Sequence, residues 1–446
     1  MKKASTFSAF DGVLGDKTVS AFDSVTADKT ISAFDRMPQD ENRQVGGVHA
    51  ESGKSLFKTA LPLIIGMLAQ GAARILTLIF SSWYGGHRTA SRFAAAPLES
   101  LVAGIAFSVS FGALILLSRR LGAGDRQGGA RIAGNAIALT LILSLALFAY
   151  SFCCGPACAL VPALAGLSDN ASAEIIVYGI VYVRPVCMFA VAALFHALFE
   201  SILIASGKPR LAMISMLTNA VLNVLLSYLL AFRTDLSHAG MGFAAVIAHA
   251  AAAVVALVLH LHYNKEVRIC KADLKIDRSI FVQLLKSIFP MLLAQFALPV
   301  AYLALAWLVP QFHASLLAGA AATGAAAVIL QPAMAVNMVG VSCISADLGA
   351  GRKDRVEQTV KKGTILCLSV TACMTLCSIL MLGNAFPFLG SGNGLGTARL
   401  AAFALGILAI AQMLTGYLQA TNHGSKGALL AVMQIAELVG WFAASQ

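Results

Sequence analysis

Polar side chains recur at helical spacing inside long apolar runs of this sequence. Each of four such groups lies on one face of a helix, because residues three, four or seven apart share a face. The four groups are Gln70, Arg74, Thr77 and Ser81; His196 and Glu200; Ser215, Asn219, Asn223 and Ser227; and Gln412, Thr415 and Gln419. Amide and hydroxyl groups in such stripes could contact a polar substrate or a cation.

Polar groups that face lipid are costly, so these stripes should face other helices or a water-filled cleft. Hydrogen bonds between helices are the simpler explanation of any one stripe, and each contributes only about 0.6 kcal/mol on average. Because the stripes occur in both halves of the chain, we expect a polar cleft with Gln70, Thr77, Asn219, Asn223, Ser227, Gln412 and Thr415 among its residues.

Three titratable residues inside the apolar runs are candidates for proton coupling. These are His196, Glu200 and His249. Histidine can gain or lose a proton near neutral pH. The alternative is that each histidine is a packed hydrogen-bond donor with no part in coupling.

Arg74 adds a positive charge to the first polar stripe. An unpaired arginine in mid-membrane costs about 2.5 to 3.5 kcal/mol, so we expect a partner, either Glu200 or Glu437. Arg74 then either binds an anionic substrate or takes the place of a coupling cation. The alternatives are a buried ion pair without transport function and an arginine close to the membrane interface.

The elements that position these residues are apolar segments long enough to cross a membrane. Of 446 residues, 58% are hydrophobic and 12% are charged, whereas a soluble domain has about 25% charged residues. We expect eleven membrane-spanning helices, because each apolar run reaches the length that a bilayer requires and none alternates as a barrel strand would. The runs are 59–83, 94–118, 133–156, 176–203, 210–232, 240–262, 287–309, 316–343, 364–385, 398–420 and 428–446.

The composition predicts an all-α, multi-pass membrane protein and excludes a soluble enzyme. The nine cysteines form no C-x-x-C pair and no ligand set with histidine, so no metal and no cofactor are expected. Cys153, Cys154 and Cys158 fall at the outer end of the third span. They could form a disulfide there or remain unpaired.

Lysine and arginine fall mainly in one set of loops. That set holds Arg119, Arg120, Arg126, Arg131, Lys208, Arg210, Lys265, Arg268, Lys271, Lys275, Arg278, Lys286, Arg352, Lys353, Arg355, Lys361, Lys362 and Lys426, whereas the opposite set holds Arg88, Arg92, Arg233 and Arg399. Basic loops remain in the cytoplasm. The asymmetry therefore predicts a protein of the cytoplasmic membrane with a cytoplasmic N-terminus, and it explains much of the net charge of +11 without nucleic acid.

Residues 1–52 differ from the rest and are predicted to form a disordered cytoplasmic tail. The sequence Ser-Ala-Phe-Asp begins at Ser8, Ser20 and Ser32, a period of 12 residues. The repeats are either peptide motifs that bind a partner or the product of duplication within a disordered segment.

Two loops share a signature, which indicates an internal repeat. Leu117 to Asp125 reads LSRRLGAGD, and Ile344 to Arg352 reads ISADLGAGR, 227 residues later. Six predicted spans separate the copies, so both halves should have the same orientation, related by a pseudo-two-fold axis along the membrane normal. We therefore expect two lobes, 53–263 with six spans and 287–446 with five, joined by a cytoplasmic linker at 264–286.

The chain resembles the multidrug and toxic compound extrusion (MATE) transporters. The resemblance rests on the order of several motifs: Leu61-Pro62, the two loop signatures, Tyr182-Val-Arg184, Ala205 to Pro209, Asn219 to Tyr228, Gly240 to Ala244, Pro290 and Gln419 to Asn422. It implies two six-helix lobes around a central cleft that opens alternately to each side. It also implies a twelfth span, so either this protein is naturally shorter or the sequence is incomplete.

The sequence departs from the family at the residues that couple transport to cations. Where many members have a carboxylate in the first span, this chain has Thr77, and their Asn-x-x-x-Asp pair reads Asn223 to Ser227. A glutamate that some members carry in the seventh span is Ala297 here. Neutral oxygens can contribute to a sodium site but cannot take up a proton near neutral pH.

The expected function is export of a small organic molecule or drug by alternating access, as an antiporter with altered coupling to sodium or protons. We expect no enzymatic step, a lipid bilayer as surroundings and a monomer. Two alternatives remain open: a non-transporting membrane scaffold that displays the N-terminal repeats, and an exporter of a lipid-linked or metal-chelating metabolite. Fold alone does not separate these cargoes.

Overall fold

The computed structural model describes residues 56–444 except 168–169, 312–315, 386–392 and 422. The N-terminal tail with its Ser-Ala-Phe-Asp repeats lies outside the described residues. Within α16 side chains are described only up to Ala436, so Glu437 also lies outside this part of the structure.

The described residues form helices and contain no strand, which confirms the all-α prediction. In chain order the elements are α4 Leu56–Trp83, α5 Gly86–Gly122, α6 Arg126–Tyr150, η1 Ser151–Cys153, α7 Cys154–Leu164, α8 Asn170–Met188, α9 Ala190–Ala205, α10 Pro209–Phe232, α11 Ser237–Tyr263, η2 Lys271–Leu274, α12 Arg278–Gln311, α13 Leu316–Gly349, α14 Lys353–Ala385, α15 Asn393–Ala420 and α16 Gly424–Ala444.

Each predicted span coincides with a helix or a pair of helices. Within the described ranges nine helical segments are long and apolar enough to cross a membrane, and α8 and α9 make a tenth if they form one span. These two helices meet at a bend of 53° around Phe189, where the sequence predicted one continuous span. α16 Gly424–Ala444 overlaps the eleventh predicted span, 428–446, but is not among these nine segments.

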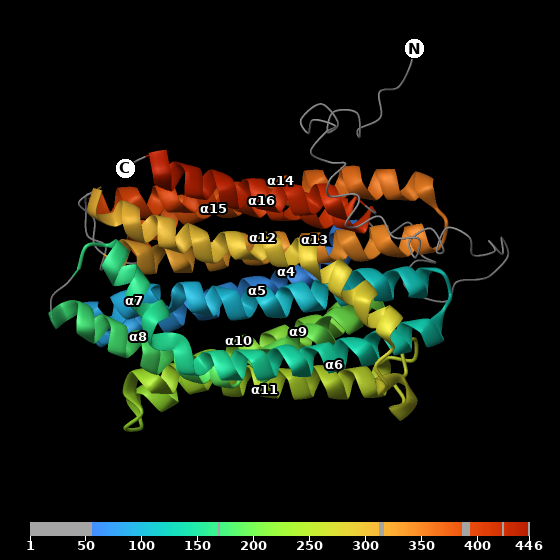
Figure 1. Cartoon of the computed structure of the whole chain (residues 1–446), viewed down its shortest axis with the longest axis horizontal. Coiled ribbons are helices and arrows are strands. Elements are labelled where there is room, and N and C mark those ends of the chain that lie inside the picture. The colour runs from blue at the N-terminus through green and yellow to red at the C-terminus, as the bar shows by residue number, and fades with distance from the viewer. Residues whose placement is uncertain (1–55, 168–169, 312–315, 386–392, 422, 445–446) are drawn as a thin grey trace, which may run out of the picture.

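The helices lie side by side in an elongated bundle (Figure 1). α6, α9, α10 and α11 occupy one side, and α14, α15 and α16 occupy the other. Between them lie α4 and α5 from the first half of the chain and α12 and α13 from the second, which contact one another. α12 begins at Arg278, so the end of the predicted linker 264–286 is helical.

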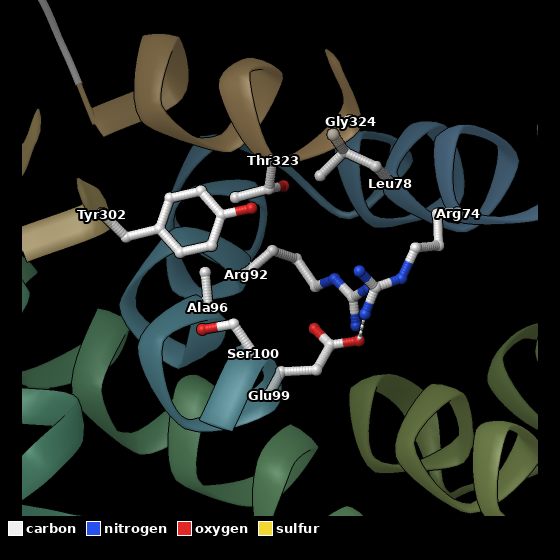
Figure 2. Close-up of a pocket in the computed structure, with 9 residues that line it drawn as sticks. All are labelled: Arg74, Leu78, Arg92, Ala96, Glu99, Ser100, Tyr302, Thr323 and Gly324. Atoms are coloured by element: carbon white, nitrogen blue, oxygen red, sulfur yellow. Dashed lines mark hydrogen bonds and ion pairs between the residues drawn. The ribbon is translucent and has the colours of Figure 1, made fainter. Parts of the chain in front are cut away.

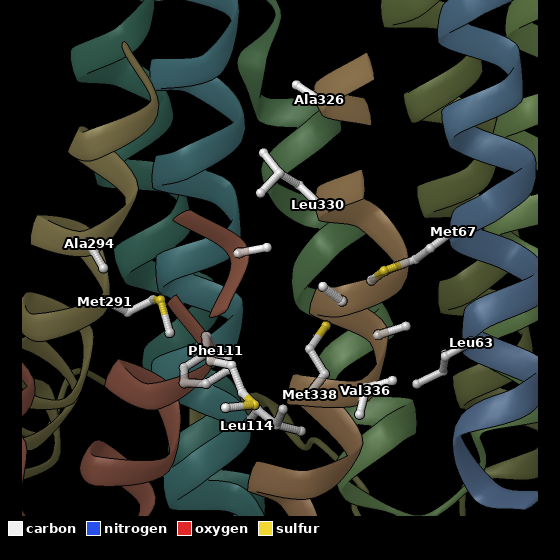
Figure 3. Packing of buried hydrophobic residues seen from close by; sticks show 14 of the residues in the cluster. Leu63, Met67, Phe111, Leu114, Met291, Ala294, Ala326, Leu330, Val336 and Met338 are labelled. Atoms are coloured by element: carbon white, nitrogen blue, oxygen red, sulfur yellow. The ribbon is translucent and has the colours of Figure 1, made fainter. Parts of the chain in front are cut away.

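The core lies where these four central helices meet. α5 and α13 are the most buried spans, with 72% and 78% of their most apolar stretch inside the structure. Both are rich in alanine, glycine and serine, which lets helix backbones approach closely. Larger side chains, including Leu63, Phe111, Met291 and Leu330, fill the spaces between the four helices (Figure 3).

The two loops with the shared signature lie against each other. Gly122 packs on the backbone of Ala346, and Gly349 packs on the backbone of Arg119, so closely that a Cβ atom at either glycine would overlap a carbonyl oxygen. Adding the repeat offset of 227 to Arg119 and Gly122 leads to Ala346 and Gly349. Such a reciprocal pair of contacts is the pattern that a two-fold relation between repeats produces.

Candidate functional site

A cavity of about 220 Å³ lies between the two halves of the chain. Its wall comes from α4, α5 and α8 to α11 in the first half and from α12 and α13 in the second. The polar and charged residues of the wall are Gln70, Arg74, Thr77, Arg92, Glu99, Ser100, Ser110, Tyr182, His196, Glu200, Asn223, His249, Gln295, Tyr302 and Gln331. Met67, Phe107, Leu298, Leu330, Met334 and Met338 contribute much of its apolar wall.

Arg74, Arg92 and Glu99 form one charged group in this wall, called here the arginine–glutamate group. Arg74 donates a hydrogen bond from Nη2 to Glu99 Oε1 and pairs with it as an ion pair. Figure 2 shows the guanidinium of Arg92 beside that of Arg74, with both side chains directed toward Glu99. Two positive charges and one negative charge leave the group with a formal charge of +1.

Glu99, and not Glu200, is thus the partner of Arg74 within the described structure, and the side chain of Glu437 lies outside it. The prediction of Glu200 was wrong because α9, which carries Glu200, turns this carboxylate toward His196 on its own helix. Arg92, which the sequence placed in an outer loop, is buried with 7% of its surface exposed. It is buried because α5 begins at Gly86, eight residues before the predicted span.

α5 brings Arg92 and Glu99 to the same wall. They are seven residues apart, or about two turns, and therefore share a face of the helix. The guanidinium carbon of Arg92 lies 3.6 Å from the ring centroid of Tyr182, so one face of the guanidinium is covered by an aromatic ring. Its Nη1 atom is buried and has no hydrogen-bond partner among the described residues.

A second polar group, the histidine cluster, comprises His196, Glu200, Ser215, Asn219 and His249 from α9, α10 and α11. His196 Nε2 lies 2.8 Å from Glu200 Oε1 and 2.8 Å from Ser215 Oγ. His196 Nδ1 lies 3.2 Å from His249 Nδ1. Asn219 Nδ2 lies 3.0 Å from the same atom of His249. Because His196 and Glu200 are 2% and 7% exposed, their interaction is shielded from bulk water.

The distances in the histidine cluster restrict where its protons can lie. A proton must lie between His196 Nε2 and Glu200 Oε1, because a ring lone pair facing a carboxylate would be repelled. The two Nδ1 atoms can share a second hydrogen bond, in which one ring donates and the other accepts. His249 and Glu200 both line the cavity.

The other predicted residues divide between the cavity and the surrounding packing. Gln70, Thr77 and Asn223 line the cavity. Ser227 does not line it, but its hydroxyl donates to Asn223 Oδ1 at 3.2 Å. Thr77 donates its hydroxyl to the carbonyl oxygen of Arg74 at 3.0 Å.

The stripe on α15 does not take part in this cavity. Gln412 and Thr415 are buried, with 2% and 0% of their surface exposed. Thr415 donates to the carbonyl oxygen of Ala411 within its own helix, and Gln419 donates to that of Ser287 on α12. Thr415 and Gln419 therefore serve helix packing, which was the alternative explanation for each stripe, whereas neither polar side-chain atom of Gln412 has a hydrogen-bond partner among the described residues.

Glu99, Arg92 and Tyr302 are cavity residues that the sequence analysis did not single out. Glu99 is an ionisable residue inside the predicted span 94–118, and such residues are functional candidates by themselves. That rule would have identified Glu99. Arg92 could not be identified in the same way, because it precedes the first residue of the predicted span.

Residues 62–229 match the MatE family model. Curated protein sequences give no match.

Solved structures of similar fold cover most of the chain. An outward-facing multidrug resistance MATE transporter of the MOP superfamily has 19% identity and a TM-score of 0.72, and the match covers 88% of this chain and 90% of the other. A MOP superfamily transporter from Pyrococcus furiosus with a binding pocket of reverse polarity has 19% identity and a TM-score of 0.71, with 86% and 87% covered. A MATE protein in the straight conformation has 19% identity and a TM-score of 0.70, with 85% and 86% covered.

The described helices surround a polar central cavity, and their fold is that of solved membrane transporters. The chain is thus similar to the MatE family over residues 62–229, and its described residues share the fold of solved MATE transporters.

Proposed function

We propose that this chain exports a small organic molecule across the cytoplasmic membrane by alternating access, and that proton uptake at the histidine cluster drives the exchange. The supporting observation is the Glu200–His196–His249 chain, whose three side chains line the cavity and of which His196 and Glu200 are buried. Its carboxylate and two imidazoles provide titratable groups in the first lobe. Thr77, Asn223 and Ser227, which stand where relatives hold acidic or cation-binding residues, are neutral.

Export requires the correct orientation in the membrane. We assign the loops around Gly122 and Gly349 to the cytoplasmic side, since most lysine and arginine residues outside the spans lie on that side. The exporter is taken to act as a monomer of two lobes, with the substrate bound between them.

The test uses the purified full chain in proteoliposomes with cationic, neutral and carboxylated dyes. An imposed proton gradient should drive dye movement against its own gradient, and an equal sodium gradient should not. Glu200→Gln should reduce proton-driven movement at least tenfold. It should retain dye counterflow, which needs no gradient and shows that the variant is folded.

His87→Gln is the matched control, because His87 pairs with Glu174 at 2.9 Å on an exposed surface outside the cavity. This variant should transport as the unmodified chain does. Equal drive by sodium would assign coupling to neutral oxygens such as those of Thr77 and Asn223. Absence of gradient-driven movement for the whole panel would favour the scaffold alternative.

A further inference from the structure

We propose that the arginine–glutamate group binds the carboxylate of an amphipathic organic anion, with Arg92 as its main ligand. This inference names the substrate class of the cavity and rests on the proposed transport function. Its evidence is separate from the histidine cluster and comes from charge, hydrogen bonding and the shape of the wall around Arg92.

The first argument is charge. Two guanidinium groups face a single carboxylate, and that carboxylate is hydrogen-bonded to Arg74. Arg92 therefore brings a positive charge to the wall without an ion-pair partner of its own among the described residues. A substrate carboxylate would neutralise the remaining positive charge of the group, whereas a cationic substrate would increase the positive charge in the cavity.

The second argument is the unused donor. Arg92 is more than nine-tenths buried, yet its Nη1 atom has no hydrogen-bond partner within the described ranges. Tyr182 covers one face of the guanidinium at 3.6 Å, and the unpartnered Nη1 donates from its edge. The edge is where arginine forms paired hydrogen bonds with a carboxylate.

The third argument is the surroundings of this edge. Tyr302 on α12 and Thr323 on α13 line the same small pocket as Arg92, and Figure 2 shows their hydroxyl groups on its opposite wall. A bound carboxylate would therefore contact both halves of the molecule. The larger cavity continues to apolar side chains such as Phe107 and Met334, which suit a hydrocarbon or aromatic body.

The experiment measures equilibrium binding to the full chain in uncharged detergent, without any gradient. The probes are 1-naphthoate, the neutral 1-naphthamide and the cationic 1-naphthylmethylammonium, which share one ring system and differ in charge. The unmodified chain should bind naphthoate at least tenfold more tightly than naphthamide, and the ammonium probe least tightly.

The naphthoate affinity of variants should follow the net charge of the arginine–glutamate group. Arg92→Gln should weaken naphthoate binding at least tenfold and leave naphthamide binding unchanged, while Glu99→Gln should strengthen naphthoate binding. The double variant R74Q/E99Q keeps the net charge of the group at +1. Its affinity for naphthoate should therefore lie within about threefold of that of the unmodified chain. If Arg92→Gln does not fold, Arg92→Lys replaces it and should bind more weakly but still prefer naphthoate to naphthamide.

Arg88→Gln is the matched control. Arg88 is on the same helix and has a hydroxyl partner, Ser237, at 3.0 Å and two tyrosine rings beside it, but it does not line the cavity. Naphthoate affinity that is unchanged in Arg92→Gln, or equal affinity for the ammonium probe, would overturn the proposal. Binding of phosphatidylglycerol in mixed micelles without binding of naphthoate would also overturn the proposal, because the group would then be a lipid site.

These outcomes are independent of the coupling mechanism. Charge-dependent naphthoate binding without proton-driven export would leave this inference standing and reject the proposed function. Proton-driven export of dyes with no preference for naphthoate would support the proposed function and reject this inference.

Discussion

Arg74 and Glu99 illustrate how a charged pair is accommodated between two membrane helices. The side chains of Arg74 and Glu99 are 36% and 19% exposed, and both line the cavity. The pair is therefore partly hydrated, so its contribution to stability should lie below that of a fully buried pair. Loss of either partner nevertheless leaves the other charge in an apolar wall.

We expect the single variants R74Q and E99Q each to destabilise the protein more than the double variant does. Neighbouring charges of this kind have interaction energies of about 0.5 to 3 kcal/mol. Thermal unfolding of the four proteins in detergent gives this coupling as a double-mutant cycle. Additive effects would mean that the two residues do not stabilise each other.

At the scale of elements, the contact between α5 and α13 determines how closely the two halves approach at the end with the basic loops. Gly122 lies against the backbone of Ala346, and Gly349 lies against that of Arg119. No side chain fits between these helices at either glycine. Arg92 and Glu99 on α5 and Thr323 on α13 line one small pocket nearer the other end of these two helices.

Gly122→Ala should therefore destabilise this arrangement by about 1 to 3 kcal/mol, the usual cost of overpacking. Gly396→Ala is the control, since a Cβ atom at Gly396 would meet no atom within 4 Å. The measurement is the unfolding midpoint in detergent. Equal midpoints for the two variants would show that the α5–α13 contact is not tight in solution.

At the scale of the whole molecule, orientation can be tested with single cysteines in a cysteine-free chain. Cysteines introduced at the exposed Ala123 or at Ala350 should resist an impermeant thiol reagent added outside intact cells, because the positive-inside rule places these loops in the cytoplasm. A cysteine at Thr234, in the exposed connection between α10 and α11, should react. Ready labelling at the first two positions would reverse the assigned topology.

The combined proposals also predict that transport responds to membrane potential. Exchange of one proton moving inward for one monovalent anion moving outward transfers two elementary charges. A potential of 100 mV, negative inside, would then contribute about 4.6 kcal/mol per cycle, at about 2.3 kcal/mol per charge. Naphthoate efflux from proteoliposomes should therefore increase strongly with a potassium diffusion potential, whereas exchange of a monovalent cation for a proton would be insensitive to it.

The sequence by itself determined the helices, because membrane crossing depends on local properties: the length of an apolar run, its lack of alternation and the polar breaks that end it. Each predicted span has a helix or a bent pair of helices at its place. The polar stripes of α4, α9 and α10 also led to cavity residues, including Gln70, His196 and Asn223.

Only the tertiary structure decided which polar groups meet. Helical spacing shows that Arg74 and Gln412 each lie on a polar face, but it does not show what that face contacts. Glu99 became the partner of Arg74 because α4 and α5 are adjacent along the cavity, and Gln412 lies away from it because α15 packs on the outer side of α13. Such pairings depend on contacts between residues far apart in the chain, and a periodic pattern within one helix carries no information about them.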